Sequence, residues 1–179
     1  MIIGSLVGLR AIEKEDLPFL RDWRNISNFR KHFREVRELN LADQESWFEH
    51  LHRSKETNFM FSIVRLEDNE LIGACGLLYT NWIARYADVS MYIGDEEAYI
   101  DNRGYALESI RLLLSYGFHN LNLNKVWMEL YEFDHEKLSL FMDSFGFQRD
   151  GLLRQNCFEG GRYWDSHIIS LLSSDFNSQ

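Results

Sequence analysis

The chain has 179 residues, 45% of them hydrophobic and 15% aromatic, so it is long enough to bury one sizeable core and too short to need two. Its formal net charge of −9 at pH 7 argues against the broad basic surface that nucleic acids or anionic membranes require, and makes a cationic or neutral substrate easier to attract. We therefore predict a single domain over residues 1–179, without a nucleic-acid or membrane partner.

The two cysteines, Cys75 and Cys157, lack the paired spacing that indicates a zinc site or a disulfide framework. Residues 1–8 carry no basic leader, cleavage pattern or long apolar span, so we expect neither an export signal nor a membrane helix. His50 and His52 resemble metal ligands, but side chains two residues apart on a helix point to different sides. These patterns predict a cytoplasmic protein without a metal ion.

The first part of the chain combines one strand with helical segments. Residues 5–12 are rich in β-formers and predict a strand. Asp16 can then cap a helix that ends near Asn25, with a proline in its first turn. Residues 26–38 carry many charges and aromatic rings without a clean period, which predicts a loop or a short helix. Asn40 can cap a second helix.

From residue 58 the period changes to that of strands. The runs 59–66, 70–79 and 85–94 are short and apolar or alternating, and polar turns separate them, as in an antiparallel meander. After Gly104, apolar residues recur every three or four positions and predict a long helix. The later elements are predicted to be a strand at 125–133, a helix at 135–145 ended by Gly146, and a hairpin of 148–158 with 162–172 around Gly160-Gly161.

This order predicts an α+β fold with a mixed, mostly antiparallel sheet of about seven strands and about four flanking helices. The long helix connects the strands at 85–94 and 125–133, and such a crossover makes that pair parallel. We expect a cleft at this junction. The glycine-bearing turn at 101–108 runs into the long helix, whose start exposes unpaired N–H groups and the positive end of the helix dipole. This turn is a candidate anion site.

Short motifs span nearly the whole chain: Val7-Gly8-Leu9-Arg10 before Glu15-Asp16-Leu17, then Leu71-Ile72-Gly73, Arg103-Gly104-Tyr105-Ala106-Leu107-Glu108, Phe145-Gly146-Phe147 and Phe158-Glu159-Gly160-Gly161-Arg162-Tyr163-Trp164-Asp165. In this ordered set the chain resembles the GNAT superfamily of acyl-CoA-dependent N-acetyltransferases. The branch it looks most like is the ribosomal-protein-alanine and spermidine acetyltransferase type. The resemblance implies direct attack of an amine on acetyl-CoA in a ternary complex.

The resemblance implies that acetyl-CoA is the acyl-donor co-substrate and that the turn before the long helix binds its diphosphate through backbone N–H groups. Asp101 stands where the family usually has Gln or Arg, so its carboxylate must face away or the turn binds less tightly. Arg103 can supply positive charge instead. His135 takes the place of a CoA-contacting Asn. The residues expected to bind the co-substrate are Met91, Tyr92, Ile93, Asn102, Arg103, Gly104, Tyr105, Ala106 and His135, of which Met91 to Ile93 act through the backbone that pairs with the pantetheine arm and polarises the thioester carbonyl.

Acetyl transfer needs a neutral amine, whereas an alkylammonium has a pKa near ~10.4, so a base or a water relay must remove a proton. Asp88 occupies the position where related enzymes often carry Glu and is the candidate base, with Glu129 on the neighbouring strand as the reserve. With an ordinary pKa of ~3.9, Asp88 needs burial or a bridging water to act.

The leaving thiolate is commonly protonated in this family by a Tyr four residues before the Gly of a Gly-Phe pair. Counting back from Gly146 gives Met142, which cannot donate a proton. Tyr131, Ser139 or solvent are the alternatives.

The acceptor enters, by resemblance, near Arg24, Asn25, Arg30 and Phe33. This basic segment fits an acceptor that carries phosphate or carboxylate, such as a nucleotide-linked amino sugar, and it opposes the cationic acceptor that the net charge favours. A protein N-terminus, a polyamine and small antibiotic amines also remain open.

The unusual Asp101 and Met142 keep a second function open, a non-catalytic module that binds acyl-CoA or a protein partner on the same fold. An exposed strand of the C-terminal hairpin could also pair across a homodimer.

Overall fold

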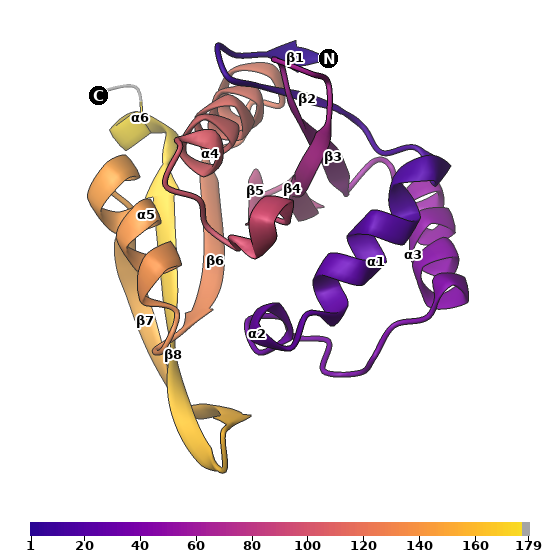
Figure 1. Ribbon diagram of the computed structural model, residues 1–179. Helices are drawn as coiled ribbons and strands as arrows, with labels where there is room; N and C mark the ends of the chain where they lie inside the picture. Colours follow the sequence, from indigo (N-terminus) through magenta and orange to yellow (C-terminus); the bar gives the residue numbers. More distant parts are fainter. Residues whose placement is uncertain (177–179) are drawn as a thin grey trace.

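The computed structural model describes residues 1–176, which form one eight-stranded sheet in the order β1-β2-β3-β4-β5-β6-β8-β7 (Figure 1). The strands are β1 (Ile2–Ile3), β2 (Val7–Ala11), β3 (Phe59–Arg65), β4 (Leu71–Asn81), β5 (Tyr86–Ile93), β6 (Lys125–Tyr131), β7 (Gln148–Glu159) and β8 (Arg162–Leu172). All neighbouring strands are antiparallel except β5 and β6, which are parallel. The predicted meander, C-terminal hairpin and parallel pair are confirmed.

The helices are α1 (Leu17–Asn25), α2 (Ser27–Arg30), α3 (Leu41–Arg53), α4 (Tyr105–Ser115), α5 (His135–Phe145) and α6 (Ser173–Phe176). Short 3₁₀ turns lie at Lys14–Asp16 and Asp95–Glu97, and a π-helical turn at Tyr116–Asn120 extends α4. Figure 1 shows α1, α2 and α3 gathered on one side of the molecule and α4 and α5 on the other.

The sheet separates two apolar cores. Successive side chains of β5 point to opposite faces of the sheet, so each of them belongs to one core. Val89, Met91 and Ile93 belong to the larger core, which α4 and α5 cover. Tyr92 belongs to the smaller core beneath α1 and α2. Asp88 shares the face of Tyr92 because the two are four residues apart on a strand. The polar side chains of β5 therefore point towards the first three helices.

The start of α4 is fixed by one carboxylate that reaches the N-terminal strand. Glu108 accepts hydrogen bonds from the backbone N–H groups of Ser5, Leu6 and Val7 at 2.6–2.8 Å. Gly104 precedes the helix with φ at +94°, a conformation that a side chain would strain. The turn at the head of α4 is thus held in place from both sides.

The sequence-based expectation differs from the structure in three places. The sheet has eight strands rather than about seven because Ile2 and Ile3 add a short edge strand to β2. Six α-helices are present in the described residues rather than about four, since α2 and α6 span four residues each. Asp16 does not cap α1 with its side chain. Its buried carboxylate instead accepts hydrogen bonds from Arg10, from the Glu13 N–H and from Ser62.

No helix within residues 1–176 is both long and apolar enough to cross a membrane.

Candidate active site

A cleft opens where β5 and β6 diverge. Within the described residues three pairs join the two strands, and the last of them is Asp88 with Trp127. Beyond that pair, β5 and β6 form opposite walls of a cavity of about 310 Å³. The remaining walls come from α1, the segment between α2 and α3, α3, β3, β4 and the first turn of α5. The cavity lies at the parallel junction, where the order of elements predicted it.

Two carboxylates from the diverging strands meet at one guanidinium in this cleft. Arg34 Nη1 lies 3.1 Å from Asp88 Oδ2, and its Nη2 lies 3.4 Å from Glu129 Oε2. Asp88 is buried, whereas the Arg34 side chain is 54% exposed. Glu129 also accepts hydrogen bonds from Ser166 at 2.8 Å and from Asn156 at 2.6 Å, which fix its position.

The surroundings of Asp88 raise its pKa, which is the direction that a general base requires. Burial raises the pKa of Asp88 above its ordinary value, and the Arg34 guanidinium opposes part of that rise. A carboxylate with a raised pKa is a stronger proton acceptor at neutral pH than a surface aspartate.

Of the alternative proton donors, the structure brings Tyr131 to the cleft and leaves Ser139 outside it. Tyr131 ends β6 and lines the cavity, and burial raises its pKa, so its hydroxyl stays protonated at neutral pH. Ser139 lies on the exposed side of α5 and donates to Asp143 at 2.5 Å. Met142 is half-buried and packs against the larger core.

A buried polar cluster beside the cleft was not found from the sequence. Lys137 lines the cavity and donates from Nζ to the Tyr99 hydroxyl at 2.8 Å, and that hydroxyl donates to Asp134 at 2.8 Å. His32 stacks on the Tyr99 ring at 4.2 Å and places Nδ1 3.2 Å from Asp134 Oδ2. Burial lowers the pKa of Lys137. The available signal was the spacing of Lys137 four residues before buried Phe141, on the buried side of α5.

The four residues expected at the acceptor entrance divide into two pairs. Arg24 and Phe33 line the cavity, with the guanidinium 4.6 Å from the ring centre. Asn25 and Arg30 lie outside it. The Asn25 amide exchanges two hydrogen bonds of 2.8 Å with the backbone of Leu39, and Arg30 pairs with Glu38. Both of these residues hold the loop that follows α2.

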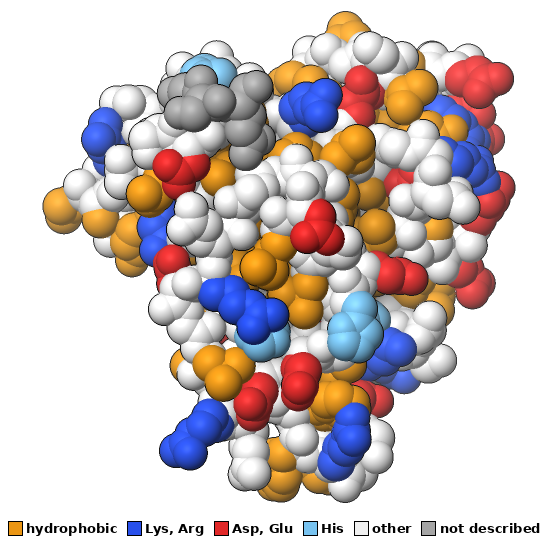
Figure 2. Space-filling model, turned by 90° about the vertical axis from the view of Figure 1, so that its left-hand side faces the viewer, with side chains coloured by type: hydrophobic (Ala, Val, Ile, Leu, Met, Phe, Trp, Pro, Cys, Tyr) orange, Lys and Arg blue, Asp and Glu red, His pale blue; other side chains and the backbone are white. Residues whose placement is uncertain are grey.

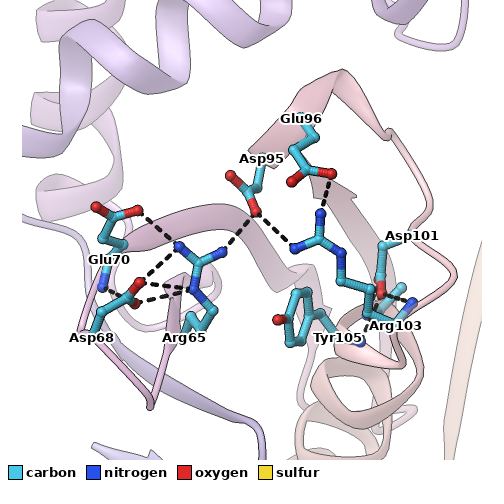
Figure 3. Close-up of polar contacts among 9 residues, drawn as sticks. Arg65, Asp68, Glu70, Asp95, Glu96, Asp101, Arg103 and Tyr105 are labelled. Atoms are coloured by element: carbon cyan, nitrogen blue, oxygen red, sulfur yellow. Dashed lines mark hydrogen bonds and ion pairs between the residues drawn. The ribbon is translucent and has the colours of Figure 1, made fainter.

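A second hollow of about 360 Å³ lies at the head of α4. Here the Asp101 carboxylate accepts hydrogen bonds from three backbone N–H groups, those of Arg103 at 2.7 Å, Tyr105 at 2.9 Å and Ala106 at 2.6 Å (Figure 3). The side chain therefore faces the turn rather than away from it. These bonds show that the turn is arranged to bind an anion, and that an anion of the chain itself is bound there.

The other residues expected to bind the co-substrate lie as follows. Asn102, Arg103 and Tyr105 line the second hollow, while Gly104 and Ala106 complete the turn. Arg103 pairs with Glu96 and lies 3.9 Å from Asp95, so its charge is largely matched (Figure 3). His135 is exposed at the start of α5, and it lines neither cavity.

β5 connects the two hollows. Asp88, Met91 and Tyr92 line the cleft, and Ile93 lines the hollow at α4. An elongated ligand with an anionic group at the head of α4 and a reactive end beside Asp88 suits this path. Acetyl-CoA has that form, and the N–H groups at the head of α4 are of the kind that would hold its diphosphate. Within residues 1–176, no three His, Cys, Asp or Glu side chains gather closely enough to hold a metal ion.

Comparison with known proteins gives consistent results. The model of the acetyltransferase (GNAT) domain matches residues 7–148. The spermidine N(1)-acetyltransferase of Vibrio cholerae is 29% identical over 175 residues, which is 97% of each chain. That of Escherichia coli K12 is 28% identical over 158 residues, 88% of this chain and 81% of that one. The structure of a Vibrio cholerae spermidine N-acetyltransferase in complex with CoA and spermine superposes with a TM-score of 0.87 at 27% identity, covering 97% of this chain and 99% of that one. A dodecameric structure of a spermidine N-acetyltransferase from the same organism has a TM-score of 0.79 at 26% identity, covering 97% of each chain.

Proposed function

The chain belongs to the GNAT acetyltransferase family and is an acetyl-CoA-dependent N-acetyltransferase, and we propose that it acetylates a primary amine of a short cationic acceptor of the polyamine type. One observation carries the choice of acceptor. The carboxylates of Asp88 and Glu129 converge on a cation, the Arg34 guanidinium, at the mouth of the cleft. Because Arg34 is 54% exposed, an ammonium group of the acceptor can take its place.

Two arginines of the basic segment that favoured an anionic acceptor are paired with neighbouring carboxylates. Arg30 pairs with Glu38, and Arg34 pairs with Asp88 and Glu129. An anionic acceptor would thus meet acidic groups at the point of reaction. The spermidine acetyltransferases among the relatives support the same choice.

We propose three roles for this chain's own residues. Asp88 binds the acceptor's ammonium and takes the proton that the amine must lose before attack. The backbone between Met91 and Ile93, beyond the last pair with β6, donates to the oxygen of the carbonyl under attack through Met91 or Tyr92, because the Ile93 N–H already donates to the Tyr99 carbonyl at 2.9 Å. Tyr131 returns a proton to the departing sulfur. Bound acetyl-CoA supplies the acetyl group as a thioester, and the products are the amide and free CoA thiol.

Direct attack in a ternary complex agrees with the state of the two cysteines. Cys75 is buried and its pKa is raised by burial, and neither Cys75 nor Cys157 lines the cavity in the described part of the chain. A thiol in that state is a poor nucleophile, so no acetyl-cysteine intermediate is expected. Initial rates with both substrates varied should give intersecting rather than parallel double-reciprocal plots.

The acceptor is tested by thiol release from acetyl-CoA with spermidine, spermine, a neutral amine of similar length and a nucleotide-linked amino sugar. We expect the polyamines to have kcat/KM at least about tenfold above the others, because a matched ammonium–carboxylate contact is worth roughly that factor. Preference for the nucleotide-linked amino sugar would refute the proposal.

Variants test the contributions of the two cleft carboxylates separately. Asp88→Asn should lower kcat by about 10²–10⁴-fold, the usual contribution of a general base. Glu129→Gln should mainly raise the KM for the polyamine. Glu132→Gln removes a carboxylate from the exposed residue just beyond β6 and is the matched control, since Glu132 does not line the cavity. An equal effect of both glutamine variants would argue against a specific role for Glu129.

We also propose that the protein self-associates along β7, the edge strand of the sheet. The dodecameric neighbour supports assembly into larger particles.

A further inference from the structure

The head of α4 is closed by an intramolecular contact. Both oxygens of Asp101 are used: Oδ2 accepts from the N–H groups of Arg103 and Tyr105, and Oδ1 accepts from that of Ala106. α4 is an 11-residue helix, so these N–H groups lie at the positive end of a well-developed dipole. The carboxylate of Asp101 neutralises that end.

The surroundings of this contact are acidic. Asp95, Glu96 and Glu136 line the same hollow. Arg103, which lines it, pairs with Glu96 and approaches Asp95, and Asp95 also binds Arg65 at 2.8 Å (Figure 3). An incoming phosphate therefore finds the described cations of this rim already paired and the N–H groups already occupied.

We propose that Asp101 is an internal competitor of the acyl donor: its carboxylate must leave the head of α4 before the diphosphate of CoA can bind there. The proposal rests on the use of acetyl-CoA stated above. Two anions cannot share the same three N–H groups, so binding of the diphosphate breaks three short hydrogen bonds and moves one carboxylate towards others. Asp101 thus lowers the affinity of the protein for the donor. It also determines how much the diphosphate adds to that affinity.

The competition affects the diphosphate end of the donor and not its pantetheine arm. The pantetheine arm would lie along β5, away from the head of α4, and its binding does not require Asp101 to move. Asp101→Asn keeps a side chain that can cap the helix through its amide oxygen, but removes the negative charge. CoA should then bind more tightly to the variant, whereas pantetheine, which lacks the diphosphate, should bind equally to both proteins.

The experiment is isothermal titration of CoA and of pantetheine into the wild-type protein and two variants. Asp101→Asn should lower the Kd for CoA by about tenfold, the scale of one lost charge contact at a helix terminus. The Kd for pantetheine should stay within about twofold. Glu97→Gln removes one negative charge from an exposed residue of the adjacent 3₁₀ turn that does not line the hollow, and should change neither Kd by more than about twofold.

Thermal unfolding provides a second readout. Without ligand, Asp101→Asn should melt at a lower temperature than the wild-type protein because the cap of α4 is weaker, and CoA should raise its Tm by more than that of the wild type. An unchanged or weaker affinity for CoA in Asp101→Asn would overturn the proposal. An equal increase in the affinity of Glu97→Gln for CoA would also overturn it. So would an equal increase in the affinity of Asp101→Asn for pantetheine.

The titrations distinguish failure of this proposal from failure of its premise, which is that the protein uses acetyl-CoA. Equal binding of CoA by all three proteins refutes the competition and leaves the donor in place. No binding of CoA by any of them, Asp101→Asn included, refutes the use of acetyl-CoA and the competition together.

Discussion

Asp88 is paired with Arg34, a residue 54 positions earlier in the chain. Burial raises the pKa of Asp88 and the Arg34 guanidinium draws it back down. A side chain from a loop therefore influences the pKa of the carboxylate that we propose as the base.

Arg34→Gln should move the acid limb of the pH profile of kcat/KM to higher pH. Removing the guanidinium removes the influence that lowers the pKa of Asp88, so the carboxylate is protonated, and inactive as a base, up to a higher pH. Thiol release measured from pH 5 to 9 checks this. Arg30→Gln, which removes a similar charge outside the cleft, should leave the limb in place. A shift of the limb to lower pH in Arg34→Gln would contradict the assignment of Asp88.

Asp16→Asn should destabilise the fold by roughly 2–4 kcal/mol at pH 7, because Arg10 and Ser62 lose a buried ionic partner. Burial alone would raise the pKa of Asp16, but Arg10, the Glu13 N–H and Ser62 together lower it. A lowered pKa gives stability that is complete above the unfolded value of ~3.9 and is lost as the pH falls through the folded value. The difference between variant and wild type should accordingly shrink below about pH 4 in urea unfolding. Asp22→Asn, from an exposed ion pair, is the control and should cost less than about 1 kcal/mol.

At this scale the order of elements predicted that the strands carrying Asp88 and Tyr131 meet at a cleft, but not which side chains touch. Asp88 and Tyr131 reach one cleft because a crossover makes their strands parallel, and that order is readable from periodicity. The contact of His32, Tyr99 and Lys137 joins three segments distant in sequence, and no local pattern encodes it. The orientation of Asp101 was open for a similar reason: it depends on the φ of Gly104 and on which anion is present.

At the scale of elements, the sequence predicted those helices and strands that are long enough for their hydrophobic pattern to repeat. The helix at 135–145 was placed at its observed bounds, since Asp134 caps it with a side-chain oxygen and Gly146 ends it with φ at +70°. Ile2–Ile3 and α6 are too short to show any period, and only their pairing or packing defines them.

Gly73→Ala should loosen the packing of β4 against β5 and, through it, the cleft. A Cβ at Gly73 would lie 2.3 Å from the backbone oxygen of Tyr92, a contact that forces the strand to shift. We expect a loss of roughly 1–3 kcal/mol in the free energy of unfolding, together with a lower kcat/KM because Tyr92 lines the cavity. Gly151→Ala in β7 is the matched control, since nothing lies within 4 Å of its Cβ position. Equal stability of the two variants would show that β4 accommodates the methyl group.

At the scale of the whole molecule, the most exposed part of the sheet is β7. The strand ends the sheet order, and all of its first nine residues are exposed. Leu152, Leu153 and Phe158 are 51%, 41% and 62% exposed. Figure 2, which views the side where α5 and the β7–β8 hairpin lie, shows apolar side chains at the surface between charged ones. An open edge strand can pair with another strand, and the exposed side chains of Leu152 and Leu153 give this one an apolar segment between Arg149 and Arg154.

The double variant Leu152→Lys/Leu153→Lys should shift the protein towards the monomer, because added charge opposes strand pairing at an edge. Light scattering coupled to size-exclusion chromatography over a range of protein concentrations measures the mass. Ile83→Lys changes a residue that is 98% exposed in the turn between β4 and β5, and it should leave the mass unchanged. A wild-type protein that is monomeric at every concentration would refute self-association.

Tyr99 has a consequence for the kinetics of the whole enzyme. It precedes Asp101 by two residues, and the ring on which it stacks, that of His32, precedes Arg34 by two residues. We expect a displacement of Asp101 to reach Arg34, which contacts Asp88 in the cleft, through this ring stack. The two substrates should load in a compulsory order, donor first, and CoA as a product inhibitor should compete with acetyl-CoA but not with the amine.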